Sequence, residues 1–250
     1  MLIDLLRKVL TRANLKPQYL NLLLSRVDLY QHAFTSESYD AKYNYEIYEL
    51  LGDASVNKFL VWYFYRRFPQ LHCSGSVKVL SRLKINYASK VILSQIADKL
   101  GFWPYIRATN DEREKAKKSL LEDVFEAFIG LTELIVDEYF AVGVGYVVVN
   151  DILTSILDTM PISLQFEDLY DAKTRLKELF DANRQLGKLV YDDFQTTTVL
   201  YQIVDGIKKK MAESYGAQKA GRHQEVSKTV LESLAKQGIS RTVNYNLFCE

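Results

Sequence analysis

Cysteine is scarce in this chain of 250 residues, in which Cys73 and Cys249 are the only two. Two cysteines cannot build a framework of several disulfides, and no CxxC motif or grid of cysteines and histidines offers a zinc site. A reducing compartment is therefore expected. Long apolar runs are also missing, since the longest candidate, residues 142–149, is far shorter than the roughly 18 residues of a membrane helix.

The first residues, Met1-Leu2-Ile3-Asp4, carry an acid where a signal peptide has positive charge. We therefore expect no membrane association and a cytoplasmic protein, with the nucleus as the alternative.

An excess of charge of one sign is absent too, because the chain has 32 Lys and Arg and 31 Asp and Glu. This balance argues against indiscriminate binding of polyanions, so any nucleic-acid contact must come from a local patch.

Hydrophobic residues make up 48% of the chain and aromatic residues 12%, which excludes disorder as the main state. Apolar residues recur at spacings of three and four up to about residue 157 and predict stacked helices. The expected helices cover residues 2–14, 17–27, 45–68, 76–99, 115–139 and 142–157. The pattern breaks around Pro161. Beyond it, a helix (172–184), three strands (189–194, 199–204, 208–215) and a last helix (224–237) predict a small α-β-β-β-α domain.

Two groups of acidic residues stand out. Glu46, Glu49 and Asp53 share one face of a helix at positions i, i+3 and i+7, and Asp123 and Glu126 are spaced i and i+3 within an apolar run. Like charges stacked on a helix repel, and burial increases the cost. A hard divalent cation such as Mg²⁺ would relieve both penalties. An ordinary solvated helix face is the alternative, which the apolar neighbours weaken.

A di-iron or di-manganese bundle also gathers acids on facing helices, but it requires Glu-x-x-His pairs. The three histidines are His32, His72 and His223, and none of them follows a Glu at that spacing. This type of metal site is therefore excluded.

Residues 44–53 (NYEIYELLGD) resemble the signature helix of the ribonuclease III family, and residues 123–127 (DVFEA) resemble its second acidic motif. Shorter matches lie at residues 33–35, 67–69, 80–82, 96–97 and 100–101. The resemblance implies an all-α endonuclease domain over residues 1–158 that hydrolyses RNA phosphodiester bonds. It also implies that Glu49, Asp53, Asp123 and Glu126 hold the catalytic Mg²⁺, with Mn²⁺ as a substitute, and that Glu46 is an outer acid of the cluster.

The C-terminal part resembles a double-stranded-RNA-binding domain, from residues 171–179 (DAKTRLKEL) to residues 227–234 (SKTVLESL). We expect a linker over 159–168, this degenerate α+β domain over 169–240 and a tail over 241–250. From Gly206 to Arg241 there are eight Lys and Arg against three Asp and Glu, the one strongly basic region. By resemblance, Lys177, Lys219, Arg222 and His223 are the candidate RNA contacts, with exposed surface residues as the alternative.

The family resemblance further implies a homodimer formed through the catalytic domain, which cuts double-stranded RNA into products with 5′-phosphate and 3′-hydroxyl ends and short 3′ overhangs. Three positions depart from the family pattern: Ser36 replaces a His, Leu50 a Phe that packs across the dimer, and Ser74 an outer Glu. Leu50 leaves the strength of the dimer open. The alternative function is a non-catalytic protein that binds double-stranded RNA on the same fold, as a ribosomal or sequestering protein, and the intact acids argue against it.

Overall fold

The structure, a computed structural model, describes residues 1–241, 243 and 245. The chain divides into two compact units, Met1–Ile162 and Ser163–Glu250, and each has a hydrophobic core of its own. Most of the expected C-terminal tail, residues 242, 244 and 246–250, lies outside the described residues.

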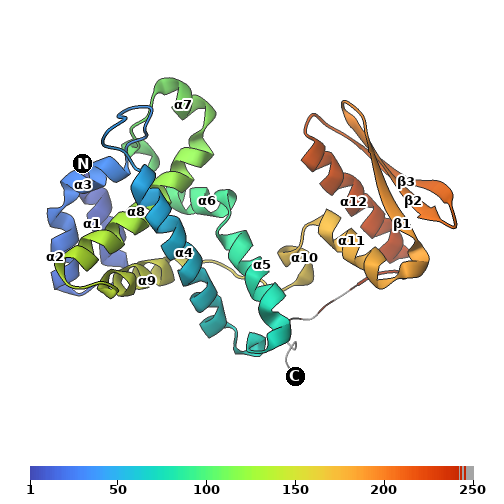
Figure 1. Ribbon diagram of the computed structural model, residues 1–250, viewed down its shortest axis with the longest axis horizontal. Helices are drawn as coiled ribbons and strands as arrows, with labels where there is room; N and C mark the ends of the chain where they lie inside the picture. The colour runs from blue at the N-terminus through green and yellow to red at the C-terminus, as the bar shows by residue number, and fades with distance from the viewer. Residues whose placement is uncertain (242, 244, 246–250) are drawn as a thin grey trace. The chain divides into compact units, whose positions relative to one another are not determined.

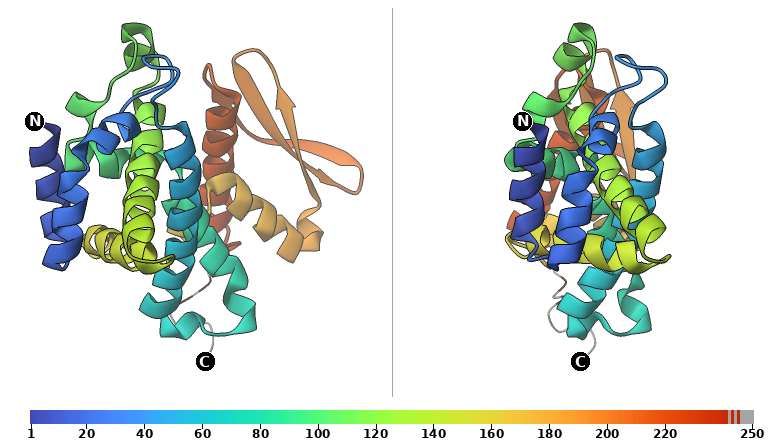
Figure 2. Two further views of the ribbon diagram at one scale, coloured as in Figure 1. Left: turned by 60° about the vertical axis from the view of Figure 1, so that its left-hand side comes forward. Right: turned by 90° about the vertical axis from the view of Figure 1, so that its left-hand side faces the viewer.

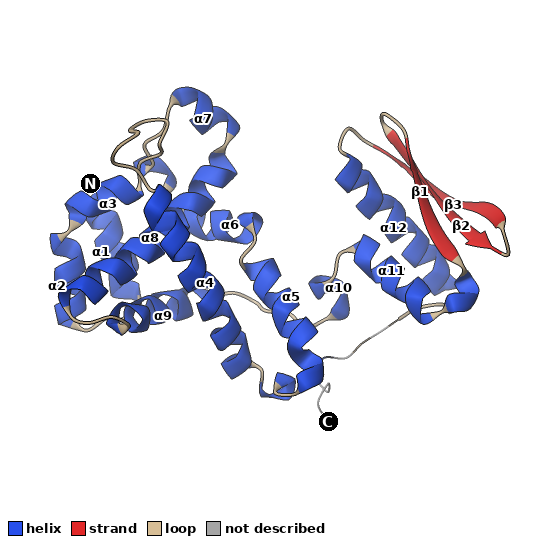
Figure 3. Cartoon of the chain, viewed as in Figure 1, coloured by secondary structure: helices blue, strands red, loops and turns tan. Residues whose placement is uncertain are grey.

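Every residue of the first unit is described, and its regular elements are helices (Figure 3). Short 3₁₀ turns lie at Pro69–Leu71, Ser74–Ser76 and Trp103–Tyr105. The α-helices are α1 (Leu2–Arg12), α2 (Pro17–Ser25), α3 (Val27–Ala33), α4 (Glu46–Arg67), α5 (Val77–Tyr87), α6 (Lys90–Leu100), α7 (Asn110–Lys115), α8 (Lys117–Tyr139) and α9 (Val144–Leu157).

Helix α8 is the centre of the first unit. It packs against α4, α6, α9 and α3, and its middle is buried on nearly every side (Figure 1). A helix that is apolar around most of its circumference is stable only when other elements enclose it in this way. Helices α4 and α8 lie side by side in both views of Figure 2, which brings the two acidic motifs to one place.

The second unit contains α10 (Phe166–Leu169), α11 (Ala172–Ala182), a 3₁₀ turn (Arg184–Leu186), and the strands β1 (Lys188–Asp193), β2 (Thr197–Val204) and β3 (Ile207–Tyr215), followed by α12 (Lys219–Lys236). The strands form an antiparallel sheet in the order β1-β2-β3. Leu176 and Phe180 of α11, Leu200 of β2 and Val226 and Val230 of α12 meet in its core. Asp205 and Gly206, both with positive φ, make the tight β2–β3 turn.

This architecture confirms the predicted fold class, a helical nuclease domain followed by a small α+β domain. One predicted helix, residues 76–99, was wrong, because α5 ends at Tyr87 and α6 begins at Lys90. Ser89 between them has extended backbone angles, and its hydroxyl donates to the carbonyl of Asn86. Serine is a typical residue at such a boundary. Helices α3, α7 and α10 were not expected, and α12 begins five residues before the predicted start.

Candidate active site

Two glycines let the backbones of α4 and α8 approach closely. A Cβ atom on Gly52 would lie 1.8 Å from the carbonyl oxygen of Glu126, and one on Gly130 would lie 2.1 Å from that of Tyr48. No other residue fits at either position without a shift of the backbone. Because Gly52 adjoins Asp53 and contacts Glu126, this close packing sets the acids of one helix against those of the other.

Three of the expected acids, the buried Glu126 and the half-buried Glu49 and Asp123, interact with one another. Glu126 is 7% exposed; burial, followed by the charges of Asp53, Glu122, Glu49 and Asp123, raises its pKa to about 8. Burial and then the charge of Asp123 raise the pKa of Glu49 to about 7. Burial is also the main cause that raises the pKa of Asp123 to about 6. The structure thus places these carboxylates close enough to disfavour one another's ionised forms.

The other two expected acids lie on the exposed side of the same cluster. Asp53 is exposed and accepts a hydrogen bond from Nδ2 of Asn57 at 2.7 Å, yet its charge acts on Glu126. Glu46 is exposed as well, and its charge acts on Glu49 and Asp123. All five acids singled out from the sequence therefore interact at one site.

Sequence reasoning missed several residues of this site. The hydroxyl of Tyr45, which is buried, donates to Oδ2 of Asp123 at 3.2 Å. Glu122 adds a sixth carboxylate, and it forms an ion pair with Lys90 of α6, with 2.8 Å between Nζ and Oε2. Position gave a signal for Tyr45 and Glu122, since each directly precedes an acid of the cluster. Nothing in the sequence indicated that Lys90 would reach α8.

The donor set suits a hard divalent cation. All its candidate ligands are carboxylates, whose oxygens are the atoms that Mg²⁺ prefers, and their mutual repulsion is what a bound cation would relieve. Among the described residues, no three His, Cys, Asp or Glu side chains are already arranged closely enough to form a metal cluster. The chemistry of the residues therefore fits a metal ion, although the side chains do not form a closed cage.

The candidate RNA contacts of the second unit separate into exposed and buried residues. Lys177 is exposed on α11 and lines a groove of about 690 Å³ between this helix and β1, together with Lys173 and Lys188. Lys219 is also exposed, with its Nζ 2.8 Å from Oδ2 of Asp193. Both lysines are accessible to a phosphate.

Arg222 is buried, with 4% exposure, and its guanidinium holds the sheet to α12. Its Nε donates to Oγ1 of Thr198 at 3.0 Å, and its Nη1 donates to the carbonyl of Gly216 at 2.7 Å. Nη2 donates to the carbonyl of Phe194 at 3.1 Å. The side chain is thus engaged inside the unit.

His223 is buried beside Arg222. Its Nε2 lies 2.9 Å from Oδ1 of Asp193, and its Nδ1 lies 2.9 Å from Nζ of Lys173. Burial removes Arg222 and His223 from the candidate RNA contacts, which corrects the sequence-based expectation. The sequence held a signal for this: both residues lie one turn before Val226 and Ser227, on the face of α12 that enters the core.

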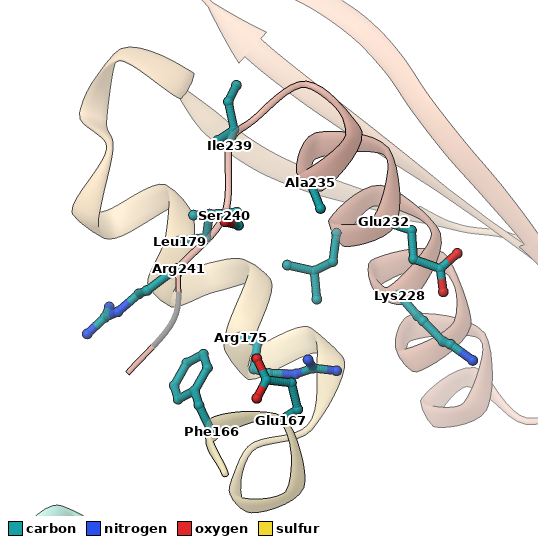
Figure 4. Close-up of a pocket in the computed structure, with 11 residues that line it drawn as sticks. Phe166, Glu167, Arg175, Leu179, Lys228, Glu232, Ala235, Ile239, Ser240 and Arg241 are labelled. Carbon is teal, nitrogen blue, oxygen red and sulfur yellow. The ribbon is translucent and has the colours of Figure 1, made fainter. Parts of the chain in front are cut away.

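The second unit also has a pocket of about 250 Å³ between α10, α11 and the end of α12 (Figure 4). Phe166 and Leu179 contribute apolar walls, and Arg175 and Lys228 contribute cations. Within the described part of the chain, the buried Nε of Arg175 has no hydrogen-bond partner. The acids of the candidate active site do not line this pocket.

Comparison with known proteins decides the family. Residues 46–134 match the family model described as "Ribonuclease III domain". A protein named "Putative ribonuclease 3" from Invertebrate iridescent virus 6 is 40% identical over 228 residues, which cover 84% of this chain and 78% of that protein. The chain belongs to the ribonuclease III family. The matched range contains all five acids, and a ribonuclease III-type enzyme is an endoribonuclease that acts on RNA.

Two further family members have similar lengths of match. The "Putative ribonuclease 3" of Frog virus 3 (isolate Goorha) is 38% identical over 229 residues, which cover 90% of this chain and 61% of that protein. The "Ribonuclease 3" of Limosilactobacillus fermentum is 31% identical over 222 residues, which cover 82% of this chain and 89% of that protein. Both alignments are too long for the catalytic unit alone.

Among the described helices, none is long and apolar enough to cross a membrane.

Proposed function

We propose that this protein is a Mg²⁺-dependent endoribonuclease that cuts double-stranded RNA and leaves 5′-phosphate and 3′-hydroxyl ends with short 3′ overhangs. The observation that carries the proposal is the convergence of acids from α4 and α8, with three pKa values raised by burial and mutual repulsion. Such a cluster is costly to fold, and a divalent cation between the helices would relieve that cost.

In this proposal, Glu49, Asp53, Asp123 and Glu126 hold the metal, and Glu46 extends the negative surface around them. Mg²⁺, or Mn²⁺ on the same oxygen donors, would lower the pKa of a bound water and neutralise charge on the phosphate being cut. The chain's own part is to hold the carboxylates in place. Tyr45 contributes by donating its hydroxyl to one oxygen of Asp123, which restricts the rotation of that carboxylate.

We also propose that the first unit forms a homodimer through the outer face of α4. Large apolar side chains are exposed along this face, including Ile47, Leu50 at 67%, Val61 and Trp62. Next to them is a pocket of about 360 Å³, lined by Leu51, Ala54, Gly130 and Leu134 among others. An apolar face with an adjoining pocket suits a two-fold contact, in which a side chain of each copy fills the pocket of the other.

For the second unit, we propose that residues 169–240 form a domain that binds double-stranded RNA through Lys177 and Lys219. Both lysines are exposed. A-form RNA is recognised mainly by its shape, its phosphates and its 2′-hydroxyls, so little sequence preference is expected from this domain. The buried Arg222 and His223 would support the domain from within.

The deciding experiment incubates the full chain with long duplex RNA in Mg²⁺, in Mn²⁺ and in EDTA, and maps the ends of the products. Cleavage that requires the metal and leaves duplex products with short 3′ overhangs at both ends supports the proposal. The Glu126→Gln variant should bind the duplex within a few-fold of the natural chain but fail to cut it. Cleavage in EDTA, or equal cleavage of duplex DNA, would contradict the proposal.

A further inference from the structure

Lys90 stands at the edge of the acidic site and is held there by α8. It is the first residue of α6, and its Nζ lies 2.8 Å from Oε2 of Glu122 and 3.2 Å from Oγ of Ser119. Glu122 is mostly buried, with 16% of its side chain exposed, whereas half of the Lys90 side chain remains exposed. The ammonium group is therefore fixed by its partners and is still accessible to a ligand.

Lys90 also differs in sign from the groups around it. The charge of Lys90 acts on Asp123, whereas the other charged groups that act most strongly on Glu49, Asp123 and Glu126 are carboxylates. The hydrogen bond that Lys90 donates to Glu122, and then the charges of Glu122, Asp123 and Glu49, raise the pKa of Lys90. Its positive charge is thus secure at neutral pH.

The position of Lys90 is not explained by the stability of its own helix. The amino-terminal end of a helix carries partial positive charge and disfavours a cation. Lys90 occupies the first position of α6, and fixing its long side chain costs rotational entropy. The reason for a lysine at this position therefore lies in what its ammonium group contacts.

We propose that Lys90 contacts a backbone phosphate of the RNA at this site, and that Ser119 and Glu122 position it for that contact. This inference rests on the proposed function, because it requires that RNA enters the acidic site. A site built from carboxylates repels phosphates, and one fixed ammonium group at its edge offsets that repulsion where the strand approaches. Lysine binds phosphate as a point charge, so the contact needs no particular base.

The competing explanation is that Lys90 only neutralises Glu122 and has no contact with substrate. The two explanations differ in their double variant. If Lys90 acts solely on Glu122, removing both charges restores the behaviour of the natural chain. If Lys90 contacts a phosphate, the double variant behaves like the Lys90 variant, because the contact is missing in both.

The test measures KM for duplex RNA in Mg²⁺ over a series of monovalent salt concentrations. Lys90→Gln should raise KM at low salt and make the plot of log KM against log salt shallower by about 0.9, the loss of about one phosphate contact. Glu122→Gln should keep the natural slope, and the double variant should keep the shallow one. Lys90→Arg preserves the charge and should keep a slope close to that of the natural chain.

Lys99→Gln is the matched control, since Lys99 is an exposed lysine near the other end of α6. It should leave both KM and the slope unchanged. A natural slope in Lys90→Gln, or recovery of the natural slope in the double variant, would overturn the inference while the proposed function stands. If the natural chain fails to cut duplex RNA in Mg²⁺, the proposed function fails and the inference fails with it.

Discussion

Two aspartates in this chain have opposite surroundings. Asp123 of the first unit is half-buried among carboxylates, and its pKa rises to about 6, mainly through this partial burial. Asp193 of the second unit accepts hydrogen bonds from Lys219, Thr198 and His223, and these hold its pKa well below the usual range. The first carboxylate makes its unit harder to fold, and the second stabilises its unit. Carboxylates that repel one another without a counter-charge in a folded protein point to a ligand. A carboxylate with a full set of hydrogen-bond partners needs no ligand, because those partners stabilise the fold.

The largest expected effect comes from replacing a carboxylate by its amide, once in the acidic cluster and once at Asp193. Glu126→Gln should lower the rate of RNA cleavage by about 1,000-fold, because a bound metal stabilises a transition state by several kcal/mol. It should leave the free energy of unfolding equal or higher, since it removes one repelling charge. Asp193→Asn should lower the stability of the second unit.

Both outcomes can be measured on the full chain. Trp62 and Trp103, the two tryptophans of the chain, lie in the first unit, so their fluorescence in urea reports its unfolding. Hydrogen exchange of peptides from α12 reports the second unit. Glu138→Gln, at an exposed acid of α8, is the control and should keep its activity. A Glu126→Gln variant that is inactive because it is unfolded would contradict the comparison.

A second pair of variants contrasts two glycines. Gly52→Ala places a Cβ atom 1.8 Å from a backbone oxygen of α8, and it should lower the free energy of unfolding of the first unit by about 3 kcal/mol and abolish cleavage. Gly221→Ala in α12 meets no atom within 4 Å and should raise stability by up to about 1 kcal/mol. Urea unfolding of both variants checks this, and a stable, active Gly52→Ala protein would refute the close contact.

Arg222 and Lys177 give a contrast within the second unit. Arg222→Met should lower the stability of that unit by about 2–3 kcal/mol, because it leaves the buried hydroxyl of Thr198 and two partly buried carbonyls without their donor. Lys177→Gln should leave stability unchanged and weaken binding of duplex RNA, with a shallower salt dependence. Hydrogen exchange of α12 and an RNA-binding titration separate the two effects. A stable Arg222→Met variant with weakened binding would return Arg222 to the RNA contacts.

The smallest expected effect is that the two units respond to acid in opposite directions. Glu49, Asp123 and Glu126 have folded-state pKa values of about 7, 6 and 8, above the unfolded values near 4, so their ionisation disfavours folding. In EDTA, the first unit should therefore gain stability as the pH falls from 8 to 5, because each carboxyl group takes up its proton in the folded state first. Tryptophan fluorescence in urea at each pH measures this change.

In the second unit, Asp193 makes stability change with pH in the opposite direction. Its folded-state pKa lies below the unfolded value near 4, so its stabilising effect is present above about pH 4 and is lost as the pH falls further. After correction for the slower intrinsic exchange in acid, the protection of α12 amides should fall below about pH 4 in the natural chain and much less in Asp193→Asn. Parallel responses of the two units to pH would remove the contrast between them.

The acids of the active site could be predicted because they are close in sequence. Glu49 and Asp53 lie one turn apart on α4, as do Asp123 and Glu126 on α8, and helical periodicity alone puts each pair on one face. The pattern of apolar residues likewise predicted the helical first unit and the small α+β second unit. The break between α5 and α6 was missed, since a single serine marks it in an otherwise continuous pattern.

By itself the sequence determined which residues share a helix face, because that follows from 3.6 residues per turn. Only the tertiary structure decided which faces meet and which charges are buried. It set Gly52 against Glu126, brought Lys90 of α6 to Glu122 of α8, and turned Arg222 and His223 into the second unit. Contacts between distant segments depend on the packing of whole helices and strands, and no local spacing records that packing.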